Sequence, residues 1–395
     1  MRRISAAEAA SRLGVKRETI YAYVSRGLLT SERHLDGKTS TFDPAEIDRL
    51  RRKKNDKQPG RLEVPIASAI TEVLDGSVAY RGHPIDELAA TAAGFEAVAE
   101  LLWTGSLGSG DPWPPSPRVA AAAGPAIDAL GPTATPSDRM MAAVVATAAA
   151  DPFRADRSAH GVINSGRVLL PTIVDVLASS GRPGGERIAD RLWSRLTADE
   201  SSAADLLDLA LVLLADHGMA TSTLAARLAA STRAAPHAVL LAGLGAVSGP
   251  LHGAASGVVH DLFVAAAQSG PDQAIAAIIE RDGKVPGFGH FIHRSRDPRH
   301  DLLMSALAAS TLPDERLDVV AAIVARTAER IPVAPNIDLA LGALTYCAGM
   351  DRAAGEVIFA IARTAGWLAH ALEEYDEAPI RFRPVGRYEP RPSRS

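Results

Sequence analysis

The sequence has one cysteine, Cys347, among 395 residues, and aromatic residues make up only 5% of it. A single cysteine cannot form an internal disulfide, so the chain fits a reducing cytoplasm. No stretch of about 18 uninterrupted apolar residues occurs, and the N-terminus leads into polar sequence. We therefore expect a cytoplasmic protein with no membrane span.

Three further patterns are missing. No cluster of cysteines and histidines has the spacing of a metal site, no glycine-rich phosphate loop follows a strand pattern, and no Gly-x-Ser-x-Gly elbow occurs. We therefore expect no metal and no tightly bound cofactor, and a nucleotide-binding α/β fold is not expected.

Helix-forming residues are abundant instead. Alanine and leucine dominate the 47% of hydrophobic residues and β-branched runs are short, which predicts an all-α fold with room for two or three domains. Charge is uneven: residues 1–61 hold 15 Lys+Arg and 8 Asp+Glu, or +7, which leaves −11 for the rest of a chain of net charge −4. A basic N-terminal module before an acidic body predicts two parts with different partners.

The N-terminal module, residues 1–57, has the pattern of a helix-turn-helix. Ser5 and Glu8 form a capping-box pattern for a helix that ends at Gly14, and a second helix is expected over residues 16–26. Asp43 begins a third helix with a basic end, after a loop around Gly37. Residues 55–60 are polar and end in Pro-Gly, which is typical of a linker. The shared apolar face comprises Ala9, Leu13, Val15, Ile20 and Val24.

Over about residues 4–54, this module resembles the excisionase and MerR-like helix-turn-helix group. The resemblance implies that it binds DNA, with one helix in a groove and the basic run at phosphates. The side chains implied to face DNA are Lys16, Arg17, Thr19, Tyr21 and Tyr23. The alternative is a small helical docking module with a solvated basic run.

Three short polar segments interrupt the apolar helices of the body. They are Gly249–Gly253 with His252, Lys284–Arg299 with His290, and Pro335–Asp338. His252 precedes residues that can begin a helix, where the helix dipole lowers its pKa and favours the neutral imidazole. Glycines before His290 let the backbone approach a ligand.

Each of these residues also has a plain structural explanation. His252 is compatible with capping a core helix, the basic segment after His290 with a solvated loop, and Asp338 with a helix N-cap. Taken together, one carboxylate and two neutral histidines suit proton abstraction next to a carbonyl. The carboxylate takes the proton, one histidine stabilises the enolate, and the other polarises a second carbonyl.

The same segments resemble the citrate synthase family, because its GPxHGxA, GFGHxxxxxxDPR and PNxD patterns occur here in order. The resemblance covers about residues 66–388. It implies condensation of an acyl-CoA with oxaloacetate by a homodimer. It also implies a large helical domain, residues 62–220 and 330–395, and a small domain, residues 221–329, that closes over the site.

The resemblance also assigns roles to single residues. Asp338 is implied as the general base, and His252 as the histidine that stabilises the enol. His290 is implied to activate the oxaloacetate carbonyl and to assist thioester hydrolysis. Substrate is implied to bind His217, Arg299, Arg363 and, reaching in from the other subunit, Arg383. The adenine end of CoA is implied to meet the backbone of Lys284, Val285, Pro286, Gly287 and Phe288.

Departures from the family pattern leave the substrate open. Gly218 and Met219 stand where Glu and a polar residue are common, and Ser256 stands where Asn is usual. Acetyl-CoA would give citrate and propionyl-CoA would give 2-methylcitrate, and one methylene in a pocket changes binding by only about 1–3 kcal/mol. A non-enzymatic alternative is a metabolite-sensing DNA-binding regulator with a citrate synthase-like body.

Overall fold

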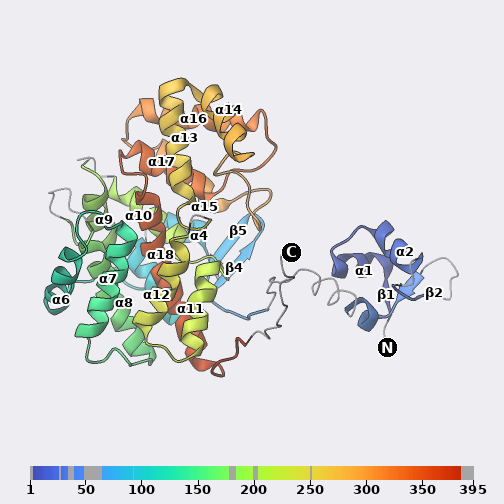
Figure 1. Cartoon of the computed structure of the whole chain (residues 1–395), viewed down its shortest axis with the longest axis horizontal. Coiled ribbons are helices and arrows are strands. Elements are labelled where there is room, and N and C mark those ends of the chain that lie inside the picture. Colours follow the sequence, from blue (N-terminus) through green and yellow to red (C-terminus); the bar gives the residue numbers. More distant parts are fainter. Residues whose placement is uncertain are drawn as a thin grey trace, which may run out of the picture. The chain divides into compact units, whose positions relative to one another are not determined.

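The computed structural model describes residues 3–25, 28–33, 40–48, 65–91, 93–177, 184–198, 203–249 and 251–383. The chain forms two compact units, Met1–Ala67, here called the head, and Ser68–Ser395, here called the body (Figure 1).

The head begins with strand β1 (Ile4–Ser5) and helix α1 (Ala6–Leu13). Ser5 caps α1, since its hydroxyl accepts the Glu8 N–H at 3.2 Å, and Gly14 ends it with a φ of 61°. This confirms the expected start and end of the first helix. Helix α2 (Arg17–Ser25) follows, and residues 44–48 are also helical. The predicted basic run and linker lie outside the described residues.

A small sheet completes the head. Strands β2 (Ser31–Arg33) and β3 (Ser40–Phe42) pair antiparallel, and β1 pairs with the other edge of β3. Residues 34–39, with the expected loop around Gly37, lie between β2 and β3 and outside the described residues. The buried core of the head contains Ile4, Ala6, Ala9, Ala10, Leu13, Ile20, Leu29, Phe42 and Ile47.

The body also starts with a small antiparallel sheet. Its order is β4 (Thr71–Leu74), β5 (Ser77–Tyr80) and β6 (His83–Pro84). The register pairs Thr71 with Tyr80 and Leu74 with Ser77. Helix α4 (Ile85–Ala90) begins directly after Pro84.

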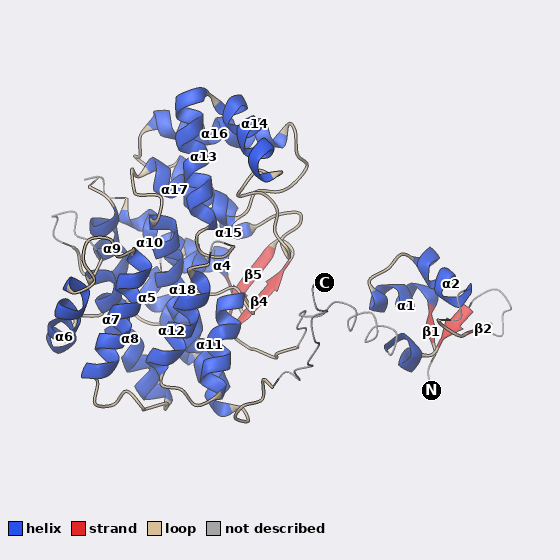
Figure 2. Cartoon of the chain, in the orientation of Figure 1, coloured by secondary structure: helices blue, strands red, loops and turns tan. Residues whose placement is uncertain are grey.

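All other described elements of the body are helices, shown in blue in Figure 2. Several begin with proline in the first turn, where its missing N–H costs no hydrogen bond. The described helices of the body after α4 are α5 (Gly94–Thr104), α6 (Pro117–Asp128), α7 (Pro136–Ala150), α8 (Ala159–Asp175), α9 (Ile188–Leu196), α10 (Ala204–Leu214), α11 (Thr221–Ser231), α12 (Pro236–Val247), α13 (Ala255–Ser269), α14 (Pro271–Asp282), α15 (Pro298–Ala308), α16 (Asp314–Ala328), α17 (Ile337–Cys347) and α18 (Ala354–Asp376). The all-α prediction is confirmed, with the two small sheets in addition.

Helix α18 forms the centre of the body core. It packs against α5, α8, α10, α11 and α12, and Trp367 on it is fully buried. A Cβ added at Gly243 of α12 would come within 2.5 Å of the Trp367 ring, so only glycine allows this close approach. Within the described ranges, no helix has both the length and the apolar character needed to span a membrane.

The expected small domain of residues 221–329 stays a prediction, since the body forms one compact unit. Helices α11 and α12 pack on α18 in the lower part of the body, whereas α17 packs on α13 and α15 in the upper part (Figure 1). Helices α13 to α17 pack on one another. Apolar, alanine-rich helices flank both predicted boundaries, so no local pattern marks the change of partner.

Candidate active site

Backbone contacts join two of the three polar segments. The Asn336 N–H donates to the Gly287 carbonyl at 2.9 Å, and its side-chain amide donates to the Gly289 carbonyl at 2.7 Å. The Ile337 N–H donates to Asp297 Oδ2 at 3.1 Å. These bonds hold the segment of His290 against the start of α17, which carries Asp338.

Three histidines meet at this junction. The ring centroids of His217, His290 and His293 are 4.9 to 5.3 Å apart, and the Nε2 atoms of His217 and His293 are 3.0 Å apart. Burial, followed by the positive charge of Arg299, lowers the pKa of His290 to about 4 and that of His217 well below its ordinary value. All three rings are therefore neutral at neutral pH, since the pKa of His293 is lowered as well.

The tautomer of His290 follows from its contacts. Its Nδ1 accepts the backbone N–H groups of Ile292 at 3.1 Å and His293 at 3.0 Å. A neutral imidazole has one donor and one acceptor nitrogen, so the proton lies on Nε2. His290 can therefore donate a hydrogen bond from Nε2 to a ligand oxygen.

His252 lies just before α13 and is also neutral. Burial, with a smaller effect from Arg363, lowers its pKa to about 4. Its Nε2 lies 2.8 Å from the hydroxyl of Ser222, which is fully buried, and its ring meets Phe359 edge-on at 5.3 Å. A serine that donates to Nε2 leaves the imidazole proton on Nδ1, where it is free to contact a ligand.

Asp338 is not the N-cap of α17, which corrects the plain explanation of this residue. Asn336 is the cap, because its side-chain oxygen accepts the Asp338 N–H at 3.0 Å. The carboxyl of Asp338 is therefore free of a capping role. Burial raises its pKa to about 6, although the nearby Arg299 and Arg363 act in the opposite direction.

The two arginines are held differently. Arg363, on α18, is buried and donates from Nε to the Leu214 carbonyl at 2.9 Å, while its Nη2 has no hydrogen-bond partner among the described residues. Its positive charge acts to lower the pKa values of His217, His252 and Asp338. Such a buried, unpaired donor is what a carboxylate ligand completes.

Arg299 is already paired within the chain. Its Nε and Nη2 donate to the two carboxylate oxygens of Asp297 at 3.0 and 2.8 Å. This bidentate pair fixes the plane of the guanidinium and leaves Nη1 outside the pair. Because Asp297 also holds Ile337, the pair ties Arg299 to the turn that carries Asp338.

The residues expected to bind CoA and the partner's substrate are the Lys284–Phe288 segment and Arg383. Val285 is buried in the core and the Gly287 carbonyl is bonded to Asn336, so these two groups of the Lys284–Phe288 segment are already occupied. Arg383 is the last described residue and is exposed. The CoA contacts of this segment and the role of Arg383 stay predictions.

Two departures from the family pattern have a structural setting. Gly218 has a φ of 60°, a conformation that glycine adopts without strain, and its N–H donates to Asp216 Oδ2 at 2.9 Å. Ser256 is buried against Gly355, and its hydroxyl has no partner among the described residues. Neither change touches the predicted catalytic trio directly.

In the head, the predicted DNA contacts are accessible. Lys16 lies just before α2 and is exposed, as are Arg17 and Tyr21 on the helix, while Thr19 is half-buried. Tyr23 instead packs against the head core. The first four remain available to a partner.

Two residues of the site escaped the sequence analysis. His293 was included only in a basic segment, and Ser222 was not singled out. Their partners, His217 and His252, lie 76 and 30 residues away in sequence. No local sequence pattern predicts such contacts, although His293, three residues after His290, could have been noted as a further histidine of this segment.

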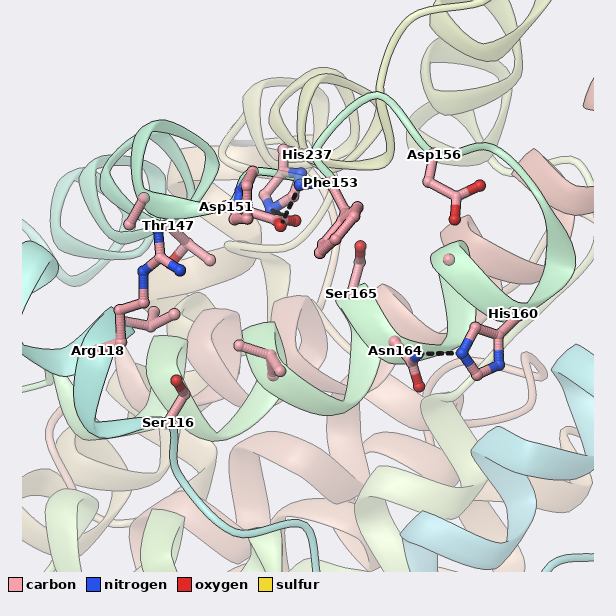
Figure 3. Close-up of a pocket in the computed structure, with 15 residues that line it drawn as sticks. Ser116, Arg118, Thr147, Asp151, Phe153, Asp156, His160, Asn164, Ser165 and His237 are labelled. Carbon is pink, nitrogen blue, oxygen red and sulfur yellow. Dashed lines mark hydrogen bonds and ion pairs between the residues drawn. The ribbon is translucent and has the colours of Figure 1, made fainter.

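A separate cavity of about 480 Å³ lies between α6, α7, α8 and α12 (Figure 3). His237, Asp151, His160, Asn164 and Phe153 are among its lining residues, and none of the predicted catalytic residues lines it. Over the part of the chain that the structure describes, no group of three or more His, Cys, Asp or Glu residues is arranged to hold a metal ion.

Two family models match the chain. The family model "Citrate synthase, C-terminal domain" matches residues 63–385, and "MerR HTH family regulatory protein" matches residues 4–60. A 2-methylcitrate synthase of Mycobacterium tuberculosis is 30% identical over 345 residues, covering 81% of this chain and 87% of that protein. A citrate synthase of Haloferax volcanii is 28% identical and covers 79% and 89%.

Solved structures show the same fold. Citrate synthase from Thermotoga maritima superposes with a TM-score of 0.67 at 23% identity and covers 85% of this chain and 96% of that one. The citrate synthase of Thermoplasma acidophilum, in a ternary complex with carboxymethyl coenzyme A and oxaloacetate, gives 0.65 at 20% identity and covers 87% and 97%. Given the match of the family model over most of its length, the chain belongs to the citrate synthase family.

Proposed function

We propose that the body condenses an acyl-CoA with oxaloacetate and water, giving a tricarboxylate and free CoA. One observation carries the proposal: a carboxylate without a structural role lies with neutral histidine donors around a buried arginine that keeps an unpaired nitrogen. A base, hydrogen-bond donors and a carboxylate anchor are the groups that this reaction needs.

The first half of the reaction forms the carbon–carbon bond. Asp338 takes a proton from the carbon next to the thioester carbonyl, and His252 donates a hydrogen bond to the enolate oxygen. The enol carbon attacks the ketone carbon of oxaloacetate. His290 Nε2–H supports the oxygen that becomes the new hydroxyl, while Arg363, Arg299 and His217 hold the carboxylates.

The second half releases CoA. Water adds to the thioester carbonyl, the carbon–sulfur bond breaks, and the thiolate leaves with a proton as CoA-SH. His290 stays within reach of this step, and its neutral form suits proton transfer at neutral pH. The backbone of Lys284–Phe288 is proposed to hold the adenine end of CoA.

The acyl donor is either acetyl-CoA or propionyl-CoA. Relatives of both kinds resemble the chain, the 2-methylcitrate synthase and the citrate synthase named above. The test measures thiol release with oxaloacetate and each donor, on the purified protein and on Asp338→Asn. Release that requires oxaloacetate and disappears in the variant supports the enzyme. No release from a folded protein that binds oxaloacetate supports a metabolite-sensing regulator instead.

We further propose that the head binds DNA. Two observations favour this second function: Arg17 and Tyr21 on α2 and Lys16 just before it are exposed, and the same unit contains the antiparallel pair β2–β3. Binding of labelled duplex DNA, measured with salt titration, tests it. The protein is proposed to act in the cytoplasm as a homodimer in which Arg383 reaches the partner's site.

A further inference from the structure

A second cluster of buried charges lies outside the proposed site, between α11 and α18. Arg227 on α11 is fully buried and donates from Nε to Glu374 at 3.0 Å and from Nη1 to Glu373 at 2.8 Å. Glu374 is fully buried as well. The reaction proposed above uses neither residue, so the cluster needs its own explanation.

Glu374 also holds the segment after α18. Arg381 donates from both Nε and Nη2 to the two oxygens of Glu374, each at 2.7 Å. The central carbon of its guanidinium lies 4.7 Å from the centroid of the Phe382 ring. The result is a rigid bidentate pair at the base of residues 377–383, here called the strap.

Further bonds bend the strap back onto α11. The Ile380 N–H donates to the Ser231 carbonyl at 2.8 Å, and Ile380 has a φ of 55°, which is unusual for a branched residue. Arg233 donates to the carbonyls of Glu374 at 2.9 Å and Glu377 at 2.6 Å. The bend is therefore held by these hydrogen bonds, because the local backbone preference of the chain does not favour it.

The strap leads directly to Arg383. Two residues of extended chain span about 7 Å, so the pair at Arg381 fixes where the Arg383 side chain starts. We propose that the Glu374–Arg381 pair, supported by Arg227, is the positioning clamp for the strap that carries Arg383 into the partner's active site. This inference rests on the proposed function of a dimeric synthase with a shared site.

The variant Arg381→Ala is well suited to the test. Glu374 stays paired with Arg227 after the substitution, so no buried carboxylate is left without a cation and the fold should persist. A misplaced substrate-binding group costs up to about 100-fold in rate. We expect Arg381→Ala to lower kcat/KM for oxaloacetate by roughly 10- to 100-fold. The conservative Arg381→Lys should recover part of it, and Arg326→Ala, at an exposed pair with Glu329, should change nothing.

Mixed dimers separate a positioning role from a general structural one. Heterodimers of Arg381→Ala with Asp338→Asn can be isolated with two affinity tags. In one of their two sites, the Arg381→Ala subunit supplies an intact Asp338 and the Asp338→Asn subunit supplies an intact strap. They should regain about half of the wild-type activity per dimer, because one of two sites works. Heterodimers of His252→Ala with Asp338→Asn should stay inactive, since both changes damage the body of a site.

The outcomes distinguish the two layers of the proposal. If Arg383→Ala is complemented by Asp338→Asn but Arg381→Ala is not, the clamp is wrong and the shared site stands. If Arg383→Ala is not complemented, or the protein is monomeric, the shared site itself is wrong. Wild-type kcat/KM in the Arg381→Ala homodimer also overturns the clamp.

Discussion

In the body, the proposed substrate-binding residues are buried and the proposed catalytic trio is half-buried, whereas Lys16, Arg17 and Tyr21 of the head are exposed. His217, Arg299 and Arg363 expose 8% of their surface or less, while Tyr21 exposes 42%. Burial raises the pKa of Asp338 and lowers the pKa values of His252 and His290, so it favours the neutral form of each side chain. Lys16 and Arg17 are solvated cations instead.

The difference shows that the two regions derive their function from different physics. In the body, fixed groups in a poorly solvated site stabilise charge as it develops, so activity depends on geometry and protonation. The DNA binding proposed for the head would depend on the number of cations near phosphates and on salt. Substitutions should therefore change turnover in one region and salt-dependent binding in the other.

The largest expected effect tests the body side of this contrast. Asp338→Asn removes the proposed base while it preserves the shape of the side chain. Turnover should fall by about 10²- to 10⁴-fold, the usual contribution of a general base. Steady-state thiol release measures it, and oxaloacetate binding should change little.

A matched carboxylate gives the control. Asp301→Asn alters a half-buried carboxylate that pairs with Arg296 and His300 outside the proposed site, and it should leave turnover unchanged. Equal losses in both variants would mean that the effect comes from general destabilisation, and the assignment of Asp338 as base would fail.

The pH profile should sharpen the same contrast. Because burial raises the pKa of Asp338 to about 6, the base is ionised above this pH and protonated below it. We expect kcat/KM to fall about tenfold per pH unit below about pH 6. His252 and His290, with pKa values of about 4, should stay neutral through the start of this decline.

Measuring kcat/KM across this range, with fold monitored by circular dichroism, tests the sign and the midpoint. A solvated carboxyl has an ordinary pKa of about 4, so a decline centred there would contradict a buried base. The residual activity of Asp338→Asn should show no such decline.

His293 tests whether neighbours of the site matter as much as its proposed catalytic groups. Its Nε2 contacts His217 Nε2 at 3.0 Å, so His293→Phe keeps a ring but removes the hydrogen bond. A lost bond of about 1–2 kcal/mol should raise KM for oxaloacetate roughly 5- to 30-fold, with a smaller change in kcat. Steady-state kinetics with varied oxaloacetate measures both.

His293→Gln, which can still hydrogen-bond, should recover part of the KM. His83→Phe, at an exposed histidine of β6, is the control and should behave as wild type. A fall in kcat with an unchanged KM would place His293 in the chemical step rather than in substrate positioning.

Much of the local structure was predictable because its signals are local. Ser5 caps α1 and Gly14 ends it as expected. Capping side chains and prolines act within a few residues of a helix end, so the sequence nearby contains them. The family motifs likewise identified the three polar segments in advance.

Contacts between distant segments were not predictable in this way. Arg227 meets Glu374 across 147 residues and His217 meets His293 across 76. The packing of α17 on α13 and α15 likewise depends on tertiary contacts. Such pairings depend on the complete fold, and residue type alone does not determine them.

The smallest expected effect tests the head. Lys16→Ala removes one exposed cation, so binding to a labelled duplex of random sequence should weaken a few-fold, and the salt slope should fall by about one. Fluorescence anisotropy across a salt series measures both, with Arg326→Ala in the body as the control. Thiol release should stay at the wild-type level, because the substitution leaves every group of the proposed active site in place. A salt slope that does not change would assign the head to a protein partner rather than to DNA, and would break the contrast with the body.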